Sequence, residues 1–91
     1  MEQTIEIKQF LDDDGKITQM PRKQKSKQAV LEYLAEKFAV GCTYSEKQVN
    51  EICDKWSTFG DFYLLRRELV DFGLLRREQD GSKYWRSDEQ Q

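Results

Sequence analysis

The sequence contains no histidine, and this absence narrows the chemistry that the chain can perform. Histidine is the commonest general base and the commonest metal ligand in proteins. The chain also has no phosphate-binding glycine loop, no nucleophile elbow and no set of zinc ligands. The sequence therefore predicts a protein that is not an enzyme and that holds neither a cofactor nor a metal.

Cysteines and long apolar runs are scarce as well. Cys42 and Cys53 are not arranged as C-x-x-C, and a small secreted domain held together by disulfides usually carries about four to eight cysteines. The first ten residues lack the basic and apolar regions of a signal peptide. No stretch approaches the roughly 18 consecutive apolar residues of a membrane span. We therefore expect a cytoplasmic protein without membrane contact.

The two cysteines have different expected environments. Cys53 falls on an apolar helical stripe and is predicted to be a small core residue. Cys42 falls in a link and can be exposed, so a redox role for it stays open. Large rings bury much area per residue. The two Trp, four Tyr and five Phe can therefore fill a small core although only 37% of the residues are hydrophobic.

The N-terminal part predicts a short β-hairpin. Ile5 and Ile7 alternate with charged residues over residues 4–10, which is the period of a half-buried strand. Residues 12–15 (DDDG) are typical of a turn, and residues 17–20 are the expected returning strand. A calcium loop is excluded, because its twelfth position must be a bidentate Glu and is Lys when counted from the first Asp.

Three amphipathic helices are predicted next, at about residues 26–38, 46–56 and 62–72. Ser45 with Gln48 fits a capping box at the start of the second helix, and Asp61 can cap the third. Gly73 stands where the third helix should end. The three apolar stripes are Val30, Leu31, Leu34, Ala35 and Phe38; Val49, Ile52, Cys53 and Trp56; and Phe62, Leu65, Leu69 and Phe72.

The C-terminal part predicts a second hairpin. Residues 74–78 and 83–86 are strand-like and flank Asp80-Gly81, a hairpin turn signal. Leu74 is expected to re-enter the core. Tyr84 and Trp85 point to opposite faces of a strand, so one should be a core residue and the other covers the helices or stacks on a ligand.

This order of elements predicts an α+β fold of the winged helix-turn-helix type. It would contain three short helices, a C-terminal β-hairpin wing and a short N-terminal β-hairpin. We expect residues 1–91 to form a single domain. Residues 1–21 would be the hairpin extension, residues 22–86 the winged helix, and residues 87–91 a disordered tail.

The segment 65–77 (LRRELVDFGLLRR), followed by DGSKY at 80–84, resembles a stretch of bacterial winged-helix regulators. There a helix ends in L-x-x-x-G-L-[LV]-x-R and leads into a basic wing. With VLEYLAEKF at 30–38 and YSEKQVNEI at 44–52, the chain is similar over about residues 15–86 to a bacterial domain family of unknown function. Members occur alone or fused to helix-turn-helix regulator domains and are often labelled transcriptional regulators. The resemblance thus implies a role in transcription regulation.

The leading functional hypothesis is a regulator that binds double-stranded DNA, with the third helix in the major groove and the wing on the backbone. Net charge is −2, but two basic islands stand out at residues 21–28 and 74–86. Arg67 is the candidate for a bidentate guanine contact. The predicted nucleic-acid contacts are Tyr63 and Arg67 on the helix, Arg76, Arg77, Lys83 and Arg86 on the wing, and Arg22, Lys23, Lys25 and Lys27 before the first helix.

The alternative is a protein–protein interaction or dimerisation module on the same fold, without DNA binding. The third helix carries the acids Asp61, Glu68 and Asp71, which oppose contact with phosphates. In that case Tyr63 and Leu64 would meet another protein or a second copy in a homodimer. A third hypothesis is RNA or single-stranded binding through the wing aromatics. A continuous positive surface joining residues 22–27 to the wing would favour nucleic acid, and an aromatic–aliphatic patch over the third helix would favour a protein partner.

Overall fold

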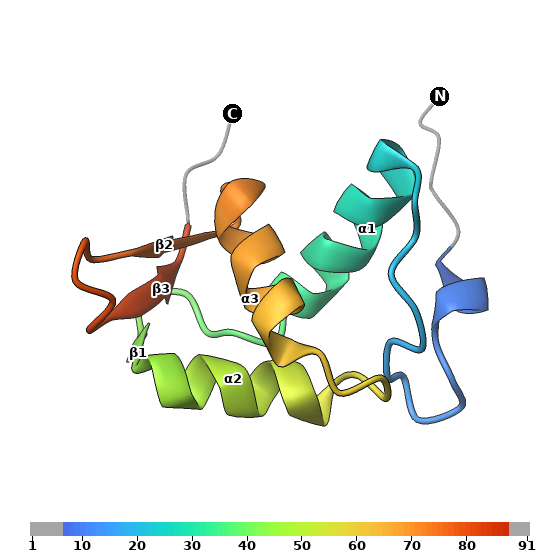
Figure 1. Cartoon of the computed structure of the whole chain (residues 1–91), viewed down its shortest axis with the longest axis horizontal. Coiled ribbons are helices and arrows are strands. Elements are labelled where there is room, and N and C mark those ends of the chain that lie inside the picture. Colours follow the sequence, from blue (N-terminus) through green and yellow to red (C-terminus); the bar gives the residue numbers. More distant parts are fainter. Residues whose placement is uncertain (1–6, 88–91) are drawn as a thin grey trace.

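The computed structural model describes residues 7–87, which form three α-helices, a three-stranded antiparallel sheet and one short 3₁₀ helix (Figure 1). The α+β class predicted from the sequence is therefore confirmed. The elements are η1 (Lys8–Phe10), α1 (Gln24–Ala35), β1 (Thr43–Tyr44), α2 (Glu46–Lys55), α3 (Phe62–Asp71), β2 (Leu75–Arg77) and β3 (Tyr84–Arg86).

The helix starts follow the predicted caps. At α2, the Ser45 hydroxyl accepts from the Gln48 backbone N–H while the Gln48 side chain accepts from the Ser45 N–H, which confirms the capping box. At α3, the Asp61 carboxylate accepts from the Leu64 N–H. α1 begins at Gln24 and ends at Ala35, two and three residues before the predicted bounds. The chain beyond it is a turn that still buries Phe38.

The three helices and the sheet enclose one cluster of buried side chains. The stripes predicted for the helices supply most of it, and Ile17 joins from the N-terminal segment. Cys53 is buried and Cys42 is exposed. The buried apolar residues are Ile17, Val30, Leu31, Leu34, Ala35, Phe38, Val49, Cys53, Leu65, Leu69, Leu75 and Tyr84.

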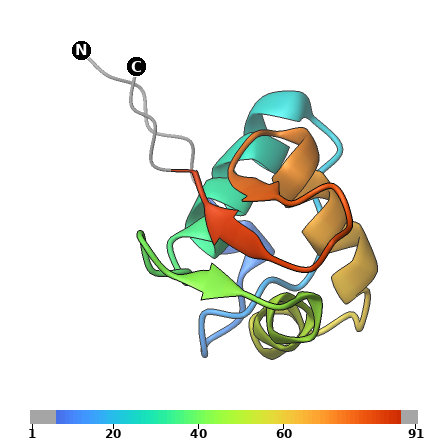
Figure 2. The same ribbon diagram turned by 90° about the vertical axis from the view of Figure 1, so that its left-hand side faces the viewer.

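The sheet has the order β1-β3-β2, so the last strand in the chain is the central one. Figure 2, in which the sheet faces the viewer, shows the helices behind it and α2 end-on. The C-terminal hairpin pairs Leu75 with Arg86 and Arg77 with Tyr84. The link that holds Cys42 leads into β1, whose Thr43 pairs with Trp85 on the other side of β3. Of the two aromatic residues of β3, Tyr84 is the core residue, and Trp85 is half-buried on the opposite face.

The predicted N-terminal hairpin forms only in part, and residues 4–6 lie outside the described chain. Across the turn, the Asp12 N–H donates to the Lys16 carbonyl (2.9 Å) and the Thr18 N–H donates to the Phe10 carbonyl (2.7 Å). Residues 8–10 form η1, and Leu11 and Ile17 share a single bridge. Ile17 instead donates its N–H to the Trp56 carbonyl (2.7 Å) and accepts from the Thr58 N–H (2.9 Å). The backbone groups of this buried residue are thus satisfied by the α2–α3 link rather than by a returning strand. The turn at residues 12–15 is confirmed.

The N-terminal segment is fixed to α1 by a side-chain contact. The Tyr33 hydroxyl donates to the Gly15 carbonyl at 2.6 Å. Gly15 has φ +80°, and a Cβ there would lie 2.8 Å from the Tyr33 oxygen. In Figure 1 this segment runs along the side of α1 that faces away from the hairpin.

Two core assignments at α3 also need correction. Phe62 is exposed, because it is the first residue of the helix and projects beyond the core. Leu74 is half-buried, and Leu75 takes the core position expected for it. The chain leaves α3 through Gly73, at φ +75°, and the Leu74 N–H donates to the Leu69 carbonyl. This helix-end geometry delays the return to the core by one residue.

The described chain continues to Ser87, whose N–H donates to the Leu74 carbonyl at 3.0 Å. The rest of the predicted tail, residues 88–91, lies outside the described residues. None of the helices in residues 7–87 has the length and apolar character needed to cross a bilayer.

Candidate functional site

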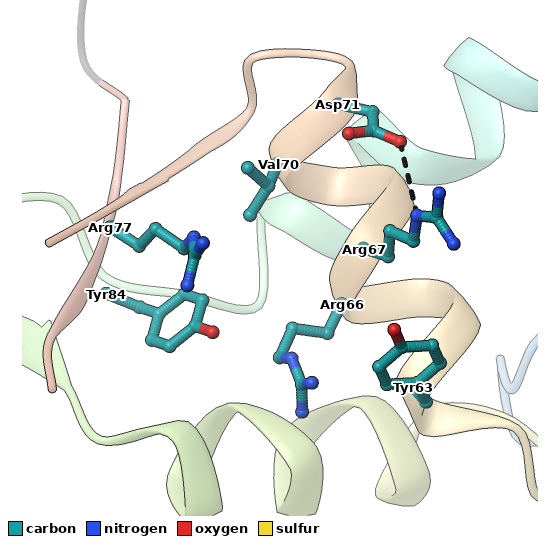
Figure 3. Close-up of a pocket in the computed structure, with 7 residues that line it drawn as sticks. All are labelled: Tyr63, Arg66, Arg67, Val70, Asp71, Arg77 and Tyr84. Carbon is teal, nitrogen blue, oxygen red and sulfur yellow. Dashed lines mark ion pairs between the residues drawn. The ribbon is translucent and has the colours of Figure 1, made fainter. Parts of the chain in front are cut away.

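A groove of about 300 Å³ separates α3 from the C-terminal hairpin (Figure 3). We call it the α3–hairpin groove. Three arginines and one aspartate line it, so the lining carries a positive charge. The lining residues are Tyr63, Arg66, Arg67, Val70 and Asp71 from α3, Arg77 from β2 and Tyr84 from β3.

The rotation of α3 decides which side chains reach this groove. Leu65 and Leu69 point into the core, so their neighbours on the helix are turned sideways and outward. Arg67 is 67% exposed at its side chain. Its Nε lies 3.9 Å from an Oδ of Asp71, one turn further along and 59% exposed. The sequence-predicted guanine-reading residue is thus at the outer surface of α3, beside an acid.

Arg66 has a different environment from Arg67. Its guanidinium lies 3.1 Å from the Glu46 carboxylate of α2 and donates to the Asn50 side chain. The side chain is only 12% exposed, and its guanidinium carbon lies 5.1 Å from the Tyr63 ring centroid. Arg66 therefore connects α3 to α2 and packs against the Tyr63 ring.

The hairpin brings one predicted contact into the groove. Arg77 shares a face of the hairpin with Tyr84, its pairing partner, and lies on the groove side. Within residues 7–87 the guanidinium of Arg77 forms no hydrogen bond or ion pair, while its backbone pairs with Tyr84 in the sheet. Arg76 pairs with Trp85 and lies on the opposite face. Alternation along β2 thus separates the two arginines that the sequence grouped together.

The other two hairpin residues lie outside the groove lining. Arg86 donates to the Phe38 carbonyl just beyond α1, at 3.2 Å, so its charge serves the contact between the hairpin and α1. Lys83 is exposed just before β3. It adjoins a turn in which the Ser82 hydrogen bonds, followed by the nearby Lys83 charge, hold the pKa of Asp80 below its ordinary value.

The basic residues just before α1 and in its first turn lie across α3 from the hairpin (Figure 1). Arg22, Lys23 and Lys25 are exposed there. Lys27 is half-buried, and its Nζ lies 3.8 Å from the Glu68 carboxylate of α3. Glu68 therefore places a carboxylate of α3 against the basic residues at the start of α1.

An aromatic pair is exposed at the start of α3. Phe62 is 37% and Tyr63 is 56% exposed. Tyr63 was predicted from the sequence to be a contact residue, whereas Phe62 was placed on the apolar stripe of the third helix. Sequence reasoning also missed Val70 and Tyr84 as groove residues, because a position on a helix flank or an inner strand face has no local signature.

No group of three or more potential metal ligands occurs among residues 7–87. Together, the groove and the fold define a small α+β protein with a basic, tyrosine-containing surface between a helix and a hairpin. A family model described as an uncharacterized protein conserved in bacteria (DUF2087) matches residues 16–86. The chain therefore belongs to this family, as its resemblance to a bacterial domain family of unknown function predicted. Searches of curated proteins and of solved structures gave no match.

Proposed function

We propose that this protein is a transcription regulator of the winged-helix type that binds double-stranded DNA. α3 would enter the major groove and the β2–β3 hairpin would be the wing on the backbone. With ten residues α3 is about 15 Å long, and the major groove of DNA admits such a helix. Arg67 would contact base edges, and Arg77 would contact phosphate.

The observation that carries the proposal is the convergence of Arg67 and Arg77 on one groove from two separate elements. Within residues 7–87, Arg77 has no acidic partner to neutralise it. Arginine is suited to phosphate and to guanine, since its planar fork donates bidentate hydrogen bonds. Tyr63, exposed at the entrance of the groove, adds a hydroxyl donor of the kind that contacts DNA backbones.

The test is a fluorescence-anisotropy titration against a random duplex at about 20 mM and about 150 mM salt, because phosphate contacts weaken steeply with salt. The chain should bind at the lower concentration. Arg77→Ala should weaken binding and reduce the slope of log K against log salt by about 0.9, the contribution of one phosphate contact. Lys8→Ala, which removes a positive charge from η1 on the far side of α1, is the matched control.

A protein partner is the second candidate function, because Phe62 and Tyr63 are exposed side by side. In addition, Lys27, Arg66 and Arg67 are each already within ion-pair distance of an acid. Absence of duplex binding at low salt would contradict the DNA proposal. A Tyr63→Ala variant that lost self-association in analytical ultracentrifugation would then favour a homodimer.

A further inference from the structure

Among residues 7–87, Asp71 is the only acid that lines the α3–hairpin groove, and it lies within ion-pair distance of Arg67. Among the Arg67 nitrogens, Nε forms the ion pair with Asp71, at 3.9 Å. In Figure 3 the two terminal nitrogens of Arg67 lie beyond this contact and point away from the axis of α3. The side of the guanidinium that forms bidentate hydrogen bonds is therefore available to solvent.

Helix stability does not account for an acid at this position. An exposed pair with i, i+4 spacing contributes only about 0.3–0.5 kcal/mol. Asp71 is also at the C-terminal end of α3, where a negative charge opposes the helix dipole. If α3 meets DNA, the same carboxylate repels phosphates. Its position therefore costs general affinity for nucleic acid.

A carboxylate beside an arginine can nevertheless improve recognition. A free arginine side chain carries about 2 kcal/mol of rotamer entropy, and holding it in its bound orientation lowers the cost of binding. Contact at Nε restricts the rotation of the guanidinium and leaves the terminal nitrogens for the two acceptors of guanine, O6 and N7. Restriction of this kind favours one base geometry over others.

We propose that Asp71 is a positioning residue for Arg67, and that the pair recognises a guanine in the major groove of duplex DNA. This inference rests on the proposed function. It adds the base that is recognised, guanine, and the residue that orients Arg67, which is Asp71. Asp71 then lowers affinity for DNA in general while it increases discrimination between sequences. Opposite effects of a single substitution on these two quantities are the signature of the proposal.

The experiment begins with selection of preferred sites from a pool of randomised duplexes, using the wild-type chain. Anisotropy titrations then compare the selected duplex, the same duplex with its guanine pair replaced by A·T, and an unrelated duplex of equal length. The variants are Arg67→Ala, Asp71→Asn and Asp71→Glu. Glu51→Gln, on the exposed surface of α2, is the charge-matched control. Circular dichroism checks that each variant is folded.

We expect wild type to prefer the guanine-containing duplex by about 5- to 100-fold, the range of one bidentate base contact. Asp71→Asn should bind the unrelated duplex more tightly than wild type and lose most of the preference. Asp71→Glu should retain most of it. Glu51→Gln should leave the preference unchanged, and Arg67→Ala should abolish it.

Three results would overturn the inference while the proposed function stands. The first is duplex binding without any sequence preference. The second is an Asp71→Asn variant that keeps the wild-type preference for guanine. The third is a wild-type preference for cytosine that Asp71→Asn loses. The last would show that Asp71 accepts a hydrogen bond from the base itself. Failure of wild type to bind any duplex at low salt would instead contradict the proposed function, and the inference with it.

Discussion

The Arg66 guanidinium of α3 lies 3.1 Å from the carboxylate of Glu46, in the first turn of α2. The neighbouring Arg67 shares its residue type but has its side chain largely in solvent. A negative charge at a helix N-terminus is favourable in itself. Glu46 therefore stabilises α2 and also forms the ion pair that joins α2 to α3. Adjacent arginines thus have separate tasks, one in the fold and one at the surface.

Arg66→Ala should lower the free energy of unfolding by about 1–3 kcal/mol, because it leaves the half-buried Asn50 without its charged donor. Arg67→Ala should change it by less than about 0.5 kcal/mol, as is usual for an exposed position. Urea denaturation of the two variants measures both values. Equal losses would show that Arg66 does not hold α3 to α2.

Gly15→Ala should destabilise the protein more than Gly60→Ala does. Both glycines have positive φ, so an alanine at either site costs about 1–2 kcal/mol of backbone strain. Only at Gly15 would the new Cβ meet another group, the Tyr33 oxygen at 2.8 Å. Thermal unfolding of the two variants should show the difference. In a Tyr33→Phe background, which lacks that oxygen, the excess loss at Gly15 should shrink.

The two thiols should differ sharply in reactivity. Cys42 is exposed and Cys53 is buried, and burial raises the pKa of the Cys53 thiol to about 12, against a smaller opposing effect of Arg66. Only the thiolate is nucleophilic, so a thiol reagent at neutral pH should modify one cysteine in the folded chain and both in urea. The Cys42→Ser variant should remain unmodified when folded. Rapid modification of that variant would contradict the burial of Cys53.

The same thiol should make the protein less stable in alkali. Below about pH 9 it is protonated in both the folded and unfolded states, so stability there is unaffected. Between about pH 9 and 12 the unfolded chain releases a proton that the folded chain retains. The free energy of unfolding should therefore fall as pH rises, by at most about 1.4 kcal/mol per pH unit from this group. Cys53→Ala should show a shallower fall between about pH 8 and about pH 10 in urea titrations, and an unchanged slope would contradict the assignment.

The parts of the fold that sequence predicts well are those decided by neighbouring residues. The capping box at Ser45, the cap at Asp61 and the hairpin turn at Asp80-Gly81 depend on hydrogen bonds over a few residues, and each was found where the sequence placed it. The N-terminal hairpin formed only as the single bridge between Leu11 and Ile17, for the opposite reason. Ile17 is satisfied by residues 56–58, about 40 positions further on, and local alternation carries no information about such a partner.

The candidate site shows the same division. Alternation along the hairpin separates Arg76 from Arg77, but which of the two faces α3 depends on the pairing register. The pairing of Arg66 with Glu46 depends on how α2 and α3 cross. The pairing of Arg67 with Asp71 could be anticipated from the sequence, because residues four apart on a helix are neighbours.

The order β1-β3-β2 has a consequence for how the molecule is assembled during synthesis. Both outer strands pair only with β3, at residues 84–86, so neither can acquire its sheet hydrogen bonds while that segment is still inside the ribosome. The helices, with their mostly local contacts, can form much earlier. The α3–hairpin groove is therefore completed last, and a nascent chain released before residue 84 would carry α3 without the surface that faces it.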